Sequence, residues 1–289
     1  MNNILVTGAN GQLGMKIRDC AKDFPKFNFL FTDIQELDIT NKIELESFVV
    51  DNKIDLIINC AAYTAVDNAE NDLDNAYKLN SFAPESLAEI STRHNLKFIH
   101  ISTDYVFDGT ANLPYNEVSQ TNPASVYGKS KLDGEKRALN SNTDCVIIRT
   151  SWLYSEYGNN FAKTILRLAK EKEMLKVVYD QVGTPTYAGN LAESVLLIVN
   201  GFFSKDIWNP GIYHYSNLGV CSWYDFAIKL VKSKNIEIEI IPVLSHEFVT
   251  KAKRPAYSVF DKSKIIKTFG IKIPYWTDAC DEMLKNYIY

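Results

Sequence analysis

The stretch ILVTGANGQLG, residues 4–14, decides the fold of this chain. It begins with a short apolar, β-branched run that meets Gly8 directly, which is typical of a strand buried on both faces of a parallel sheet. Gly11 and Gly14 follow at three-residue spacing and lead into a helix-compatible segment at residues 15–22. This order of strand, glycine-rich turn and helix predicts the opening unit of an α/β fold.

Apolar runs and helical patterns continue to alternate along the first half of the chain. Further strands are predicted at residues 27–31, 55–60, 97–102 and 144–149, with helices between them at residues 43–49, 72–92 and 127–139. This rhythm indicates a Rossmann-type, doubly wound parallel sheet, in which right-handed crossovers place the loops after the strands along one edge. We expect residues 1–150 to form a dinucleotide-binding domain.

The rhythm changes in the second half. Helical patterns at residues 161–172, 191–199, 223–232 and 277–287 are separated by loops that contain Pro185, Pro210, Pro242, Pro255 and Pro274. Residues 151–289 are therefore predicted to form a smaller, mixed α/β lobe that covers the sheet edge and supplies most substrate contacts. Some of its segments are expected to pack back on the first domain.

Composition and charge restrict the kinds of partner. Hydrophobic residues make up 46% of the 289 residues and charged residues 23%, as in ordinary globular proteins. A formal net charge of −4 gives no support to a nucleic-acid partner. No apolar run reaches the roughly 20 residues of a membrane span, so no membrane partner is expected.

The cysteines and the N-terminus predict a cytoplasmic protein. Five cysteines, widely separated and never in a C-x-x-C pair, argue against structural zinc and against a disulfide framework. The first residues lack the basic segment and long apolar run of a signal peptide.

The glycine loop predicts a site for the pyrophosphate of a dinucleotide. Gly8 permits the tight turn, Gly11 lets backbone N–H groups approach the phosphates, and Gly14 lets the helix pack close to the sheet. The helix N-terminus then offers unpaired N–H groups and a partial positive charge. Cofactor contacts are expected from these glycines and from the residues between them, Asn10, Gln12 and Leu13.

Asp33 bears on the choice between NADH and NADPH. It lies 19 residues after Gly14, at the end of the second predicted strand, where a carboxylate can accept hydrogen bonds from the adenosine ribose and repel a 2′-phosphate. NADH is therefore favoured. Arg18 and Lys42 are possible partners of a 2′-phosphate, which keeps NADPH open.

Tyr127, Lys131 and Thr103 predict a reductase of carbonyl groups. Tyr127 and Lys131 lie four residues apart in a predicted helix, so they share one face of it. An ammonium beside Tyr127 would lower the tyrosine pKa from its usual value near ~10 toward the range useful for acid catalysis. Thr103 follows a strand that ends at the same edge, where its hydroxyl can donate to the oxygen that Tyr127 protonates.

The ordered motifs resemble those of the extended short-chain dehydrogenase/reductases over essentially the whole chain. Beside the glycine loop, the resembling segments are LDIT at 37–40, NCAAYTAVD at 59–67, STDYVFDG at 102–109, YGKSK at 127–131, RTSW at 149–152, QVGTPT at 181–186 and RP at 254–255. Within this family the chain is most similar to reductases that act on a dTDP-linked 4-keto-6-deoxyhexose.

The resemblance implies a reaction of nucleotide-sugar metabolism, in the biosynthesis of cell-surface polysaccharide. A hydride passes from the nicotinamide to C4 of dTDP-4-dehydro-L-rhamnose, and Tyr127 protonates the C4 oxygen to give dTDP-L-rhamnose. Lys131 also holds the nicotinamide ribose.

The resemblance also implies two sets of contacts. Asp38 and Ile39 border the adenine, and the residues after the third strand lie beside the cofactor, namely Ala61, Ala62, Tyr63 and Thr64. Thr103, Asp104 and Trp152 contact the nucleotide-sugar. Arg254 is a candidate for its diphosphate, because a guanidinium suits bidentate phosphate contact.

No metal is predicted. Some family members are implied to dimerise around magnesium held by acidic side chains, one of them just after the glycine loop. Met15 occupies that position here, so magnesium is not carried over, and the chain is expected to be a monomer or a homodimer. The four histidines have no metal-ligand spacing.

Three alternatives keep the same motifs. A related 4-ketoreductase, for example one that forms deoxytalose, could share all of them. Related dehydratases are implied to carry a glutamate after the active-site Thr-Asp pair, where this chain has Tyr105, which argues against that class and its epimerase relatives. A non-catalytic regulatory subunit, like that of methionine adenosyltransferase, would not need Thr103, Tyr127 and Lys131 intact.

Overall fold

A six-stranded parallel sheet organises the computed structural model, which describes residues 1–287. Its strand order is β10-β5-β4-β3-β1-β2. In chain order the strands are β1 (Asn2–Thr7), β2 (Phe27–Thr32), β3 (Ile54–Asn59), β4 (Lys97–Thr103), β5 (Cys145–Thr150) and β10 (Gly211–Tyr215). The predicted doubly wound sheet is confirmed, because the strand order reverses direction between β1 and β3, with parallel neighbours throughout.

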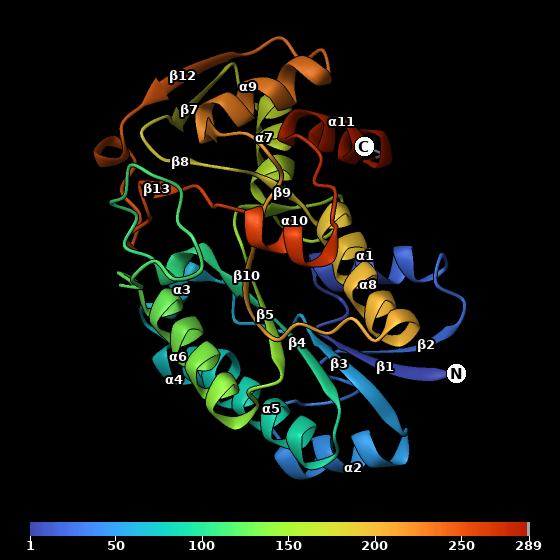
Figure 1. The fold of residues 1–289 in the computed structure, drawn as a ribbon. Coiled ribbons are helices and arrows are strands. Elements are labelled where there is room, and N and C mark those ends of the chain that lie inside the picture. Colours follow the sequence, from blue (N-terminus) through green and yellow to red (C-terminus); the bar gives the residue numbers. More distant parts are fainter. Residues whose placement is uncertain (288–289) are drawn as a thin grey trace.

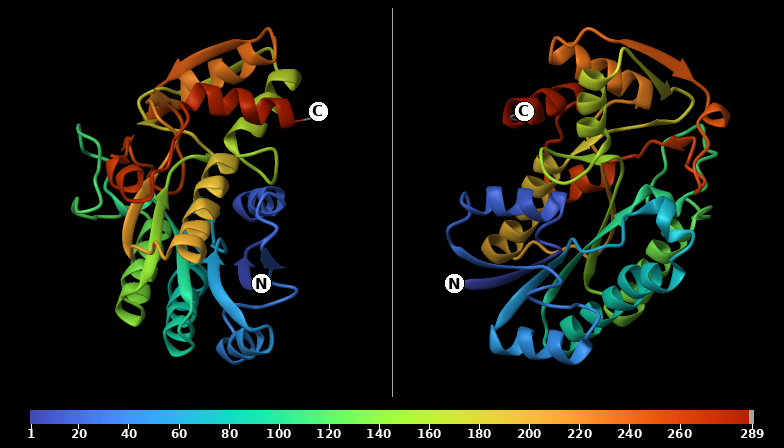
Figure 2. Two further views of the ribbon diagram at one scale, coloured as in Figure 1. Left: turned by 45° about the vertical axis from the view of Figure 1, so that its right-hand side comes forward. Right: turned by 180° about the vertical axis from the view of Figure 1, so that it is seen from behind.

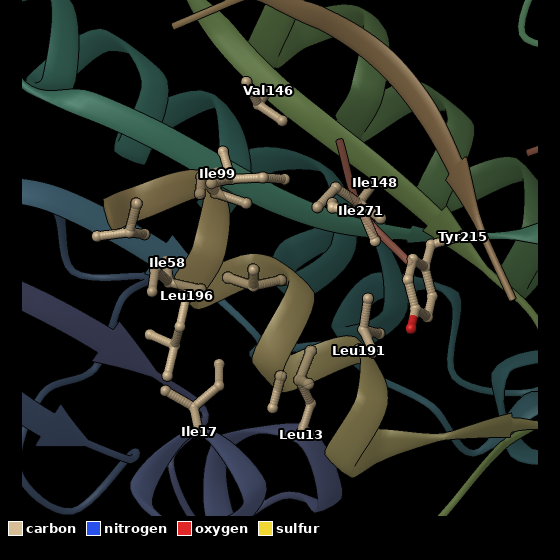
Figure 3. Packing of buried hydrophobic residues seen from close by; sticks show 14 of the residues in the cluster. Leu13, Ile17, Ile58, Ile99, Val146, Ile148, Leu191, Leu196, Tyr215 and Ile271 are labelled. Carbon is tan, nitrogen blue, oxygen red and sulfur yellow. The ribbon is translucent and has the colours of Figure 1, made fainter. Parts of the chain in front are cut away.

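Helices cover both faces of this sheet, which makes three layers (Figure 1). One face carries α1 (Gln12–Ala21), α8 (Ala188–Lys205) and α10 (Ser263–Phe269), and the other carries α2 (Lys42–Asp51), α5 (Ala83–Arg93) and α6 (Val126–Ser141). Successive residues of each central strand enter opposite layers, so Ile4 packs toward α1 and α8 while Leu5 packs toward α2 and α5. Figure 3 shows Ile17 of α1 and Leu196 of α8 meeting Ile58 of β3 in the first of these layers.

The helix predicted over residues 72–92 is interrupted. Instead of one continuous α-helix, α4 (Leu73–Tyr77) passes through a π-helical turn, η1 (Lys78–Phe82), into α5. Pro84 has no N–H to donate to the carbonyl of Asn80, so the regular hydrogen-bond ladder cannot run through this point. The wider turn carries the buried side chain of Asn80 toward the end of β3.

The second lobe has a core of its own. It is built from α7 (Phe161–Glu171), β7 (Met174–Val178), α9 (Trp223–Ser233), β12 (Glu239–Val243) and α11 (Trp276–Asn286). β7 and β12 pair in parallel, and Leu166, Phe226 and Met283 are buried among these elements. Short strands connect the lobe to the rest of the chain: β6 (Leu153–Tyr154), β8 (Val182–Gly183), β9 (Thr186–Tyr187), β11 (Cys221–Ser222) and β13 (Tyr257–Ser258).

Two elements of the second half lie in the first domain. β10 pairs with β5 along Gly211↔Val146 to Tyr215↔Thr150 and so extends the central sheet. α8 packs beside α1, with Leu191 and Val195 in the same core layer as Leu13 (Figure 2). The chain therefore crosses from the sheet to the second lobe and back more than once. Among the helices that residues 1–287 form, none has both the length and the apolar character of a membrane span.

Candidate functional site

A cavity of about 960 Å³ opens at the carboxyl edge of the sheet and reaches into the second lobe. The turns after β1, β2, β3, β4 and β5 line one part of it, and side chains of α7, β7 and α9 line the other. A volume of this size suits a ligand larger than a single sugar.

The glycine loop forms the floor of the cavity at the start of α1. Gly8 has φ +64°, and a Cβ there would lie 2.6 Å from the Cα of Ala61. A Cβ on Gly14 would lie 2.5 Å from the carbonyl oxygen of Gly8. Gly11 is the N-cap of α1, and within the described chain no side chain caps that end. The loop thus leaves a backbone cradle with free helix N–H groups, which is the kind of place where a pyrophosphate binds.

The residues between the glycines, Asn10, Gln12 and Leu13, make different contacts. Leu13 is buried in the core layer under the sheet. The side-chain oxygen of Gln12 accepts hydrogen bonds from Asn160 at 2.8 Å and from Ser155 at 3.1 Å, which ties the glycine loop to the second lobe. Gln12 and Leu13 line the cavity. Asn10 does not belong to the cavity wall in the described part of the chain.

Asp33 stands at the end of β2 on the cavity wall. One of its oxygens accepts from the backbone N–H of Asn10 at 2.9 Å, and the other accepts from that of Ile34 at 2.8 Å. Arg18 and Lys42, the two cations that could meet a 2′-phosphate, have partners in this structure. The Arg18 guanidinium lies 4.9 Å from the centre of the Phe31 ring, and Lys42 pairs with Glu89.

Asp38 and Ile39 also line the cavity. Asp38 accepts from both the hydroxyl of Thr40 at 2.7 Å and its backbone N–H at 2.9 Å. The hydrogen bond from the Thr40 hydroxyl is the main reason that the pKa of Asp38 is lowered. These two hydrogen bonds fix the turn after β2, and the charge of Lys78 also lowers the pKa of Asp38.

The segment after β3 is held by Asn80, which sequence reasoning missed. Ala61, Ala62 and Thr64 line the cavity, but Tyr63 does not belong to its wall in the described chain. The side chain of Asn80 accepts from the Tyr63 N–H at 2.8 Å and donates to the Tyr63 carbonyl at 3.1 Å. It also donates to the hydroxyl of Ser130 in α6 at 3.1 Å, so one buried amide joins this segment to α6.

Thr103 and Tyr127 both line the cavity and share a hydrogen bond. β4 ends at Thr103, and α6 begins at Val126 with Ser125 as its side-chain cap. Burial raises the pKa of Tyr127 above its usual value, and a hydrogen bond with Thr103 opposes that rise. The sequence predicted a Tyr127 pKa lowered by Lys131. This part of the prediction is wrong, because the phenol is buried and the Lys131 amine donates to the carbonyl oxygen of Ile101.

Lys131 lies one helical turn after Tyr127 on α6 and is 2% exposed. Its amine donates to the carbonyl oxygen of Ile101 at 2.6 Å and lies 3.4 Å from Nε2 of His100. Burial lowers the pKa of Lys131 to about 8, against the opposing charges of Glu135 and Cys60. Lys131 therefore titrates closer to neutrality than an ordinary lysine.

A buried ion pair fixes α6 against the sheet. Glu135 accepts from Arg149 of β5 through both oxygens, at 2.9 and 2.6 Å, and from the hydroxyl of Ser102 at 2.5 Å. Glu135 and Arg149 are 1% and 2% exposed. This bidentate contact positions the helix that carries Tyr127 and Lys131.

Asp104 contributes a buried carboxylate beside Thr103. It is 3% exposed, lines the cavity and accepts from the Thr103 hydroxyl at 3.0 Å. Burial raises its pKa to about 6. The carboxyl group of Asp104 is thus suited to hydrogen-bond a polar ligand that enters the cavity.

Aromatic side chains form the far end of the cavity. Trp152 adopts φ +49° and stacks on Trp223 with ring centres 3.5 Å apart. The ring centre of Phe161 lies 4.5 Å from that of Trp223, and the Phe226 ring stacks on the Phe161 ring. Of these four lining residues only Trp152 was predicted, because the others come from helices α7 and α9, whose apolar periodicity does not distinguish a core face from a cavity face.

Arg254 bridges the two lobes at the cavity wall. Its guanidinium pairs with Asp67 of α3 (Val66–Ala69) at 2.8 Å and approaches the Tyr105 hydroxyl at 3.4 Å. Both charged side chains are partly exposed, at 31% and 41%. In residues 1–287, no three His, Cys, Asp or Glu side chains gather closely enough to hold a metal ion.

The whole chain matches one protein family. Residues 1–289 match the family described as the RmlD substrate binding domain. A dTDP-4-dehydrorhamnose reductase of Aggregatibacter actinomycetemcomitans is 42% identical over 292 residues, covering 99% of this chain and 98% of that one. The chain belongs to the dTDP-4-dehydrorhamnose reductase family. The resemblance inferred from the motif order is thus confirmed.

Two further members of the comparison support this family. The spore coat polysaccharide biosynthesis protein SpsK of Bacillus subtilis is 39% identical over 286 residues and covers 99% of this chain and 98% of its own. The crystal structure of a dTDP-4-dehydrorhamnose reductase from Bacillus anthracis, in complex with NADP, superposes with a TM-score of 0.92. It is 37% identical and covers 99% of this chain and 100% of its own.

Proposed function

We propose that this protein reduces the C4 ketone of dTDP-4-dehydro-L-rhamnose to dTDP-L-rhamnose with NAD(P)H, in the biosynthesis of cell-surface polysaccharide. The observation that carries the proposal is the position of Thr103, Tyr127 and Lys131 on one cavity wall, above a glycine loop at the carboxyl edge of the sheet. The names of the family members support the substrate class and the direction of the reaction.

The residues present fit a dinucleotide. A Cβ at Gly8 or Gly14 would collide with backbone, so this part of the chain is shaped for close approach of a ligand and cannot be filled by side chains. Gly8, Gly11 and Gly14, with the loop residues Gln12 and Leu13, would hold the pyrophosphate, and Asp33 would hold the adenosine ribose. Asp38 and Ile39 would border the adenine, and Ala61, Ala62 and Thr64 would flank the rest of the cofactor.

The chemistry then divides among three side chains. When bound, the reduced nicotinamide supplies the hydride for C4. Tyr127 gives its phenolic proton to the C4 oxygen, and the Thr103 hydroxyl, released from Asp104, donates a hydrogen bond to the same oxygen. Lys131 stabilises the phenolate that Tyr127 leaves and would hold the nicotinamide ribose.

The far end of the cavity would receive the dTDP-sugar. Asp104 and Trp152 would contact the sugar, and Arg254 would take the diphosphate once it exchanges Asp67 for that anion. We propose a lobe division to match, with residues 1–150 binding the dinucleotide and residues 151–289 contributing most of the substrate site. Location in a reducing cytoplasm suits the five free cysteines, and the active unit would be a monomer or a homodimer.

The test is an NADH-oxidation assay with dTDP-4-dehydro-L-rhamnose beside other 4-keto-sugar nucleotides, followed by determination of the product's C4 configuration. We expect the rhamno product and the highest kcat/KM for this substrate. A talo product, or no turnover with NADH and NADPH alike, would reject the proposed substrate.

A further inference from the structure

His100 lies directly beneath Lys131 and is not used by the chemistry described above. It sits on β4, is 0% exposed, and its Nε2 is 3.4 Å from the Lys131 amine. On the other side of the ring, Nδ1 is 3.0 Å from Nδ2 of Asn59, which ends β3 and is also 0% exposed. The imidazole thus stands between a fixed amide and the amine of the predicted catalytic lysine.

The orientation of the Asn59 amide is settled by its other partners. The side-chain oxygen of Asn59 accepts from the backbone N–H of Ala61 at 3.1 Å and from the hydroxyl of Thr7 at 2.7 Å. A backbone N–H can only donate, so the oxygen of Asn59 must face Ala61. The NH₂ group of Asn59 therefore faces His100 and donates to Nδ1.

This fixes the tautomer of His100. Since Nδ1 accepts a hydrogen bond, a neutral imidazole must carry its proton on Nε2. The ring is neutral, because burial, and secondarily the charge of Lys131, hold the pKa of His100 well below its usual value. The N–H of Nε2 then faces the Lys131 amine. It can form a hydrogen bond there only if the amine nitrogen has a free lone pair.

An ammonium has three donors and no lone pair, so the contact with His100 favours the uncharged amine. Lys131 can accept from His100 and still donate to the carbonyl oxygen of Ile101. Within the described chain, the charges of Glu135 on α6 and Cys60 after β3 act on Lys131, and Tyr127 lies one helical turn before it. Glu135 favours the ammonium, but its carboxylate is already occupied by Arg149 of β5 and Ser102 of β4.

We propose that His100 is a positioning residue that stabilises the uncharged amine of Lys131 through its Nε2–H, and so eases release of the lysine proton to Tyr127 during turnover. The inference rests on the proposed reduction. In each cycle the O–H bond of Tyr127 breaks as the O–H bond of the sugar forms. An N–H bond of the Lys131 ammonium then breaks as the Tyr127 O–H bond is restored, and a proton from water reloads the lysine.

Two substitutions separate the contact with Lys131 from the contact with Asn59. His100→Gln places an amide near Lys131 whose oxygen can accept from the ammonium, which reverses the polarity of the contact. His100→Asn keeps an acceptor for Asn59 and leaves Lys131 without the N–H partner. His214→Gln is the matched control, because His214 is also 0% exposed but contacts Arg149 in place of Lys131.

The decisive readout is the titration of Lys131 in the cofactor-free protein. Lysine labelled with ¹³C at Cε reports the charge of each amine by NMR, and the Lys131→Met variant assigns the signal. We expect a wild-type midpoint near pH 8, a rise of about one unit in His100→Gln and a smaller rise in His100→Asn. The alkaline limb of the kcat/KM profile should move by the same amount in each variant.

A wild-type midpoint at the ordinary lysine value, or midpoints unchanged in whichever His100 variant folds by near-UV circular dichroism, would overturn the inference. A midpoint shifted equally by His214→Gln would overturn it too, because the effect would then not depend on the contact. Absence of turnover with a dTDP-4-keto-sugar would reject the proposed function but would not change the NMR titration of Lys131. Failure of the proposed function can therefore be distinguished from failure of the inference about His100.

Discussion

The two ends of the cavity are built in different ways. The cofactor end is made of backbone: Gly8 and Gly14 lie where a Cβ would strike the chain, and the helix start beside them has no side-chain cap in the described structure. The aromatic end is made of side chains, with Trp152 and Trp223 stacked and Phe161 beside them, from three separate segments. Tyr127 and Lys131 lie between the two ends.

The difference teaches which changes each end tolerates. A backbone cradle fails when any side chain is added, whatever its polarity, because the collision is with main-chain atoms. A wall of stacked rings can lose one member and still leave a cavity, at the cost of affinity for the ligand that it contacts. Substitutions at the cofactor end should therefore affect folding and cofactor binding. Substitutions at the aromatic end should affect binding of the sugar nucleotide.

The largest effect is expected from Gly8→Ala. Positive φ and the collision with Ala61 together should destabilise the protein by about 3 kcal/mol or more and abolish NADH binding. Gly270→Ala is the control, since Gly270 has φ +66° but nothing within 4 Å of a Cβ, so only about 1 kcal/mol of backbone strain remains. Urea unfolding of both variants measures this difference, and equal losses would contradict the collision.

Much of the cofactor end could be predicted because its signals are local. The residues 4–14 specify a strand, a turn with positive φ and a helix within eleven positions, and each consequence follows from glycine geometry. Thr103 was found in the same way, since it lies at the carboxyl end of a buried strand.

The remainder depends on contacts between distant parts of the chain. The hydrogen bonds of Asn80 join it to Tyr63 and Ser130, which lie 17 and 50 residues away in the sequence. The pKa of Tyr127 reflects its burial beside Ala69 and Ala76, and the Lys131 amine donates to Ile101; neither contact is visible in a four-residue spacing. β10 completes the sheet from residue 211 onward, after an intervening lobe.

At the aromatic end, Trp223→Leu should raise KM for the dTDP-sugar about tenfold, because the stacked partner of Trp152 is lost. The Kd of NADH should stay at the wild-type value. Trp208→Leu serves as the control, since the Trp208 indole donates to the carbonyl of Asp144 and is not part of the cavity wall among the residues described. Steady-state kinetics and NADH titration check both variants. A tenfold loss of NADH affinity in Trp223→Leu would contradict the assignment of separate ligands to the two ends of the cavity.

The smallest effect is expected from Asp33→Ala at the cofactor end. Loss of the carboxylate should weaken NADH binding by about fivefold and NADPH binding by no more than about twofold, because a 2′-phosphate gains from removal of the nearby negative charge. Fluorescence titration with the two cofactors measures the ratio. An equal loss for both would remove Asp33 from the ribose contact.

The central claim is that Tyr127 delivers a proton to the sugar carbonyl from a site that both ends of the cavity enclose. Tyr127→Phe tests it most directly, because the ring that packs against Tyr105 is kept and only the hydroxyl is removed. We predict that kcat with dTDP-4-dehydro-L-rhamnose falls about a thousandfold while the Kd of NADH stays at the wild-type value. Reduction of the keto-sugar by Tyr127→Phe at the wild-type rate would contradict the account.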